Sequence, residues 1–146
     1  MSDVKTVEYT KAAAPTPATY MGTEYEGRLK VILGTYTCAS LAVGSTIRIG
    51  KLRKGETFVM GWVSGADLTS AGTLILGDIK DSDGSTVGDA DRYMQATVFT
   101  TALQQTACNA IAGRAYTATE DLTLVLTTAT EEMTGLINVI IIKSCP

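Results

Sequence analysis

Apolar and polar residues alternate through much of the chain after residue 28, and a period of two is typical of β-strands. In Thr46–Ile49, Ile47 and Ile49 fall on one side and Arg48 on the other. In Leu122–Leu126 three leucines share one side, which we expect to face a core. Further strands are predicted at residues 28–33 and 73–77.

Two of the predicted strands carry large apolar side chains in regular alternation. The first has Leu29, Val31 and Leu33 on one face. The second, Thr57–Val63, has Phe58, Met60 and Trp62 on one face, so we expect Trp62 in the core. A sugar-binding platform is the alternative for this tryptophan, but the sequence offers no aromatic strip around it.

Glycine-containing turns separate these strands at short intervals, and many short strands with such turns predict an all-β fold. We expect a β-sandwich or a jelly-roll-like unit with at most one short helix. The helix would span Asp89–Val98, with Asp89 or Asp91 as its N-cap. Its buried side would be formed by Tyr93, Met94, Thr97 and Val98.

The last strand, Leu136–Ile142, is apolar on both of its faces. It is therefore predicted to be a central strand, or one that a neighbouring subunit also covers. A helix of the same chain is the other possible cover. If a subunit provides it, Ile137, Val139 and Ile141 are the candidate interface residues, and the protein self-associates.

The first 26 residues differ from the rest because they contain few large aliphatic side chains and no regular period. Pro15 and Pro17 favour extended backbone. Tyr9, Tyr20 and Tyr25 are of a residue type that is enriched at interfaces. We interpret residues 1–26 as an extended N-terminal arm that orders on a partner, and residues 27–146 as the β-sandwich domain. A tail without a role is the alternative.

The composition and net charge of the chain argue against several classes of function. The 146 residues fit one domain, and the net charge of −3 argues against a general nucleic-acid binder. Cys38, Cys108 and Cys145 have no metal-site spacing and are expected to be free, mostly buried thiols. The first residues lack the apolar region of a secretory signal, and no apolar run is long enough for a membrane. We therefore expect synthesis in a cytoplasm and no membrane partner.

No residue pattern indicates catalysis. The sequence has no histidine, which removes the commonest general base and metal ligand, and it has no phosphate-binding loop. The best candidate site is the acidic stretch Asp78–Asp91, which carries five aspartates and could bind calcium or provide a catalytic carboxylate pair. It lacks the closing glutamate of a calcium loop, so turns and a cap explain it better. We expect no enzyme activity, no cofactor and no metal.

Several segments resemble the small virion proteins of tailed bacteriophages. Leu41–Gly55 is similar to a glycine turn, strand and second turn in these proteins, although Arg53 stands where they often have proline. Leu76–Asp78 and Gly88–Met94 match a later stretch. The resemblance implies a capsid decoration (cement) protein, a β-sandwich that coats the capsid exterior as a homotrimer. Its partner would be the major capsid protein. A head-fibre base, a tail protein and a receptor- or carbohydrate-binding module are the alternatives.

Overall fold

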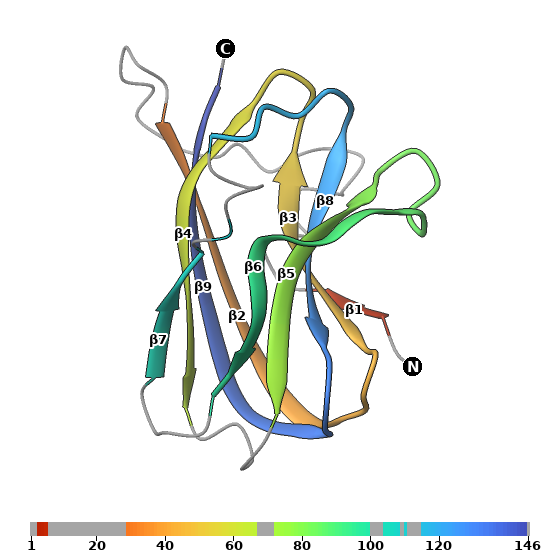
Figure 1. Ribbon diagram of the computed structural model, residues 1–146, viewed down its shortest axis with the longest axis vertical. Helices are drawn as coiled ribbons and strands as arrows, with labels where there is room; N and C mark the ends of the chain where they lie inside the picture. Colours follow the sequence, from red (N-terminus) through yellow and green to blue (C-terminus); the bar gives the residue numbers. More distant parts are fainter. Residues whose placement is uncertain are drawn as a thin grey trace.

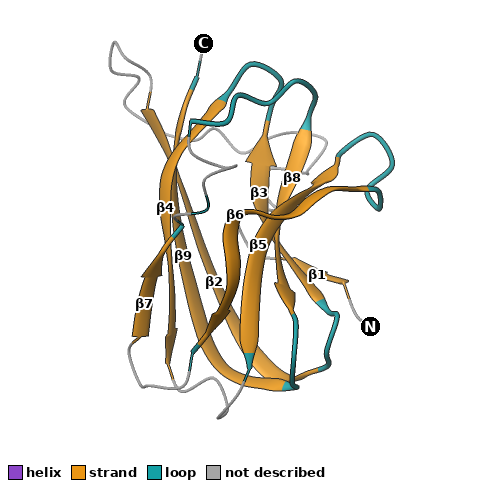
Figure 2. Cartoon of the chain, viewed as in Figure 1, coloured by secondary structure: helices purple, strands orange, loops and turns teal. Residues whose placement is uncertain are grey.

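The computed structural model describes residues 3–5, 29–66, 72–99, 104–108, 110 and 115–145. These residues form nine strands and their connecting loops, and they contain no helix (Figure 2). The strands make two sheets that pack face to face (Figure 1). The prediction of an all-β sandwich is confirmed.

One sheet has five strands in the order β1-β3-β8-β5-β6. All neighbours in it are antiparallel except β1 and β3, which are parallel. Its strands are β1 (Asp3–Lys5), β3 (Thr46–Leu52), β8 (Leu122–Thr128), β5 (Thr73–Lys80) and β6 (Val87–Val98).

The other sheet has four antiparallel strands in the order β2-β9-β4-β7. Its strands are β2 (Leu29–Leu41), β9 (Met133–Ser144), β4 (Thr57–Ala66) and β7 (Gln104–Ala107). The strand that is apolar on both faces, β9, lies between β2 and β4 as a central strand, as predicted.

The core lies between the two sheets. Ile47 and Ile49 of β3 and the three leucines of β8 are buried there, in the orientation that their alternation predicts. From the other sheet, Phe58 packs against Tyr93 with ring centroids 4.4 Å apart. Buried apolar side chains from both sheets form one cluster, and their removal from water stabilises the sandwich.

The helix predicted at Asp89–Val98 is wrong, because this segment is strand β6, paired with β5. Its register is irregular: Leu74 pairs with Thr97 and Leu76 with Met94, so β6 contributes an extra residue between the pairs. Such bulges break the period of two, and Tyr93 and Met94 are both fully buried although they are consecutive. Buried side chains at this spacing imitate the buried side of a helix.

A bulge in β4 changes which of its side chains face the core, so the predicted face of this strand is wrong after Phe58. Phe58 pairs with Lys143 and Met60 with Ile142, so two residues of β4 oppose one of β9. Phe58 is buried in the core, whereas Met60 is 43% exposed on the opposite side of the sheet. Trp62 is half-buried and shares the side of Met60, so its predicted place in the core is wrong.

The predicted N-terminal arm contains one described segment. Asp3–Lys5 forms β1, with Val4 opposite Ile47 and packed against the core. Residues 6–28 lie outside the described residues, and they include Tyr9, Pro15, Pro17, Tyr20 and Tyr25.

Candidate interaction surface

The outer side of the four-stranded sheet carries an unusual number of exposed apolar side chains. On β2, Leu29 is 59% exposed, and Val31 and Leu33 are each 57% exposed. Leu136 and Ile140 of β9 and Met60 of β4 are also exposed. Single exposed apolar residues are ordinary in soluble proteins, but contiguous patches mark interaction sites.

The strand register brings these side chains into rows. Val31, Ile142 and Met60 are direct partners across β2, β9 and β4, and so are Leu33, Ile140 and Trp62. Partners in an antiparallel pair point to the same side of the sheet, so each row is continuous. We call this surface the outer apolar face and define it as Leu29, Val31, Leu33, Met60, Trp62, Leu136, Ile140 and Ile142. None of these side chains can carry a charge.

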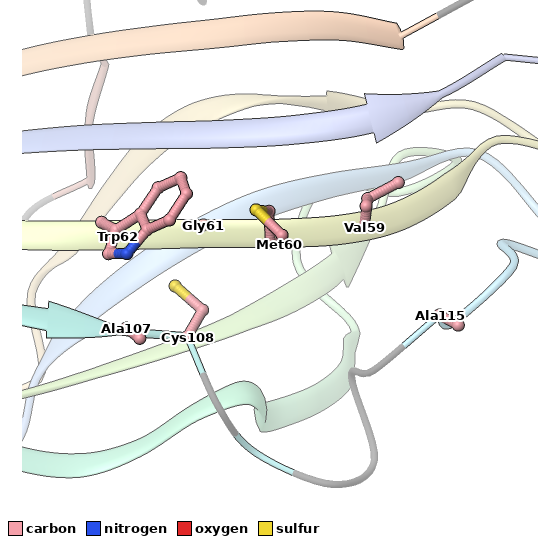
Figure 3. A pocket seen from close by; sticks show the side chains of 7 residues that line it. All are labelled: Val59, Met60, Gly61, Trp62, Ala107, Cys108 and Ala115. Carbon is pink, nitrogen blue, oxygen red and sulfur yellow. The ribbon is translucent and has the colours of Figure 1, made fainter. Parts of the chain in front are cut away.

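A hollow of about 420 Å³ adjoins this face beside β4 and β7 (Figure 3). Trp62, Met60 and Val59 line it from β4, and Cys108 points toward β4 from the end of β7. Gly61 leaves room for the Cys108 thiol, because a Cβ there would lie 3.2 Å from Sγ. Burial raises the pKa of Cys108 to about 12, so the thiol stays protonated and lines the hollow as an apolar group.

The interface residues expected from the sequence lie on the other side of β9. Ile137, Val139 and Ile141 are buried inside the sandwich of a single chain. The apolar side chains that β9 exposes are Leu136 and Ile140. A strand that is apolar on both faces has no pattern that distinguishes the inner side, so the sequence alone could not choose between them.

The aspartates of the acidic stretch Asp78–Asp91 do not converge on one site, because each contacts different neighbouring groups. Asp78 is fully buried; its Oδ2 accepts hydrogen bonds from Arg92 Nε at 2.7 Å and from the Tyr93 hydroxyl at 2.9 Å. Asp81 pairs with Lys51 at 2.9 Å and accepts a hydrogen bond from the Thr123 hydroxyl at 3.0 Å. These aspartates bind cationic and polar side chains of this chain.

Asp83 and Asp89 have equally local surroundings. Asp83 accepts hydrogen bonds from the hydroxyl and backbone N–H of Thr86 and from the backbone N–H of Ser85, which lowers its pKa to about 2. Asp89 lies 3.9 Å from Arg92. Within the described part of the chain, no three acidic, cysteine or histidine side chains gather as a metal site would require.

One buried polar cluster was not predicted. Lys143 Nζ pairs with Glu56 Oε2 and donates to the Lys51 carbonyl at 2.8 Å, and the Cys145 thiol donates to Glu56 Oε1 at 3.2 Å. Burial and the hydrogen bond to Glu56 raise the pKa of Cys145, so the thiol is not activated as a nucleophile. The cluster therefore holds the end of β9 to the turn before β4.

The described geometry defines a small β-sandwich protein whose most prominent surface is apolar and uncharged. No described segment is a helix long and apolar enough to cross a membrane.

Two solved structures contain chains with the same fold over nearly their whole length. A chain of the capsid of Ralstonia phage GP4 matches with a TM-score of 0.71 and 18% identity, over 99% of this chain and 98% of that one. A chain of the cyanophage Pam1 capsid asymmetric unit matches with a TM-score of 0.63 and 22% identity, over 92% and 96% of the two chains. No family model matches the sequence, and no curated protein sequence matches it.

Proposed function

We propose that this protein is a non-enzymatic structural component of a tailed-phage virion that binds the outside of the capsid and stabilises it as a decoration (cement) protein. The observation that carries the proposal is the fold, which is shared at nearly full length with chains of two phage capsids. Both comparisons cover the chain as one unit, so the likeness is not limited to a common sheet.

The outer apolar face supports an assembled role. Removing apolar surface from water is favourable by about 25 cal/mol per Å². A protein that remained alone would keep this surface hydrated, with Leu29, Val31 and Leu33 more than half exposed. A structural protein that functions among fixed neighbours can bury it instead.

The proposed capsid-binding element is the N-terminal arm. Tyr9, Tyr20 and Tyr25 would bind the major capsid protein, and Pro15 and Pro17 would keep the backbone extended. An extended segment spreads its contacts over a wide area of a neighbouring subunit. Assembly as a homotrimer would place three arms on the lattice and strengthen attachment by multivalency.

Co-sedimentation with purified capsids that lack the protein tests this function. The wild-type chain should sediment with capsids and saturate at a fixed number of copies. Replacing Tyr9, Tyr20 and Tyr25 with alanine should weaken attachment at least tenfold, which corresponds to about 1.4 kcal/mol. The matched control replaces Thr10, Thr19 and Thr23 of the same segment with alanine and should bind like wild type.

Two results would count against the proposal. A wild-type chain that stays in the supernatant at micromolar concentration is not a capsid decoration protein. If the tyrosine variant binds as tightly as the threonine control, the arm is not the capsid-binding element.

A further inference from the structure

We propose that the outer apolar face is the surface on which a second copy of this chain packs. The inference rests on the proposed function and deepens it, because it assigns self-association to particular residues. The contact would be made by β2, β9 and β4, through the rows Val31–Ile142–Met60 and Leu33–Ile140–Trp62.

The size of the face suits an interface between copies. Along β2 it runs from Leu29 to Thr37, the partner of Leu136, a length of about 27 Å at roughly 3.4 Å per residue. Across β2, β9 and β4 it is about 14 Å wide at roughly 4.8 Å per strand. In projection each copy therefore offers about 400 Å², and two copies together would bury about 800 Å² besides the lining of the adjoining hollow, an area that suits a weak, concentration-dependent contact.

The absence of charge on the face favours another copy over a different partner. The eight side chains that define it provide no ion to pair with a charged surface, so a charged partner would lose hydration there without compensation. A second copy brings the same uncharged side chains, and in the proposed homotrimer three copies of the face would meet around the three-fold axis. The polar groups at its centre, Thr35 and Asn138, already bond to each other, since Thr35 Oγ1 donates to Asn138 Oδ1 at 3.0 Å.

Trp62 marks the expected centre of the binding energy. Tryptophan is enriched among the residues that dominate interfaces, above all where a pocket adjoins it. The hollow beside Trp62 can take an aliphatic side chain of the second copy, and its lining from Gly61, Ala107 and the protonated Cys108 is apolar.

The chain offers a closely matched pair of variants. Val31 lies on the outer apolar face and Val87 lies on β6 of the other sheet, and both are 57% exposed. Mass by light scattering, with folding checked by circular dichroism, is measured for Val31→Asp and Val87→Asp across protein concentration. Val31→Asp should raise the dissociation constant of the oligomer at least tenfold, whereas Val87→Asp should assemble like wild type.

A second measurement needs no variant. Trp62 is the only tryptophan of the sequence, so dilution of the wild-type oligomer should shift its emission to longer wavelength at the concentration where the mass falls. A wild-type chain that is monomeric at 100 µM, or an oligomer that dissociates without this shift, would overturn the inference. Equal assembly of the two valine variants would also do so. These measurements use the protein without capsids. A failure of self-association can therefore be distinguished from a failure of capsid binding in the co-sedimentation experiment.

Discussion

The buried ion pair between Asp78 and Arg92 provides a sharp test of how the sandwich is held together. Asp78 follows Leu74 and Leu76 on the inner side of β5, and it is fully buried. Its Oδ2 has two hydrogen-bond donors, while Oδ1 has no partner among the described residues. The Arg92 guanidinium in turn lies 4.0 Å from the centre of the Tyr116 ring. The carboxylate therefore depends on Arg92 for its charge compensation.

Replacing Arg92 with methionine keeps most of the side-chain volume and removes the charge. A buried carboxylate that loses its cationic partner is destabilised by about 3 to 5 kcal/mol. Without Arg92, Asp78 would keep only the Tyr93 hydroxyl as a donor. The matched control is Lys51→Met, which removes the partner of Asp81 at 2.9 Å. That pair is about a quarter exposed, so solvent screens it and the expected cost is at most about 1 kcal/mol.

The free energy of unfolding is measured for both variants by urea denaturation at one protein concentration, so that self-association affects each equally. Arg92→Met should lower it by at least 2 kcal/mol more than Lys51→Met does. Equal and small losses would refute the reasoning, since they would mean that Asp78 is compensated without Arg92.

Three further predictions follow from other contacts. Burial raises the pKa of Glu56, but Lys143, the Arg53 backbone N–H and the Cys145 thiol together outweigh burial and hold the pKa below its ordinary value of 4.5. The stability that this carboxylate contributes is therefore present above pH 4.5 and lost as the pH falls further, and Glu56→Gln should weaken this dependence in acid melting curves. Gly61→Ala should cost about 1 to 3 kcal/mol in urea unfolding, because the new Cβ would lie 2.9 Å from the Ile140 carbonyl oxygen. EDTA should leave the melting temperature unchanged, as the aspartates bind this chain's own groups.

Strands whose apolar and polar residues alternate clearly could be predicted from the sequence, even where the pairing shifts register, as in β3 between Arg48 and Gly50. Ile47 and Ile49, and the leucines of β8, are buried as their spacing requires. Strands β4 and β6 could not be predicted in detail, because each contains bulges. A bulge adds one residue and reverses which side the following residues face, so Met60 and Trp62 lie on the outer side and β6 was mistaken for a helix.

The sequence predicted that β9 needs cover on both faces, but it did not predict which of its residues lie on the exposed face. The apolar character of Leu136–Ile142 indicated that something must cover β9, but the inner side depends on which face meets the other sheet. Which face meets the other sheet is decided by tertiary packing, and this packing buries Ile137, Val139 and Ile141 in the core. Likewise, Asp78 belonged to an acidic stretch that suggested a turn, whereas its carboxylate is buried against an arginine fourteen residues later.

Cryo-electron microscopy of capsids with and without added protein tests the proposal that this chain binds the outside of a capsid. We predict extra density on the outer surface of the shell, at repeated lattice positions, with room for the β-sandwich described here. Density confined to the tail, or no density at saturating protein, would contradict the account.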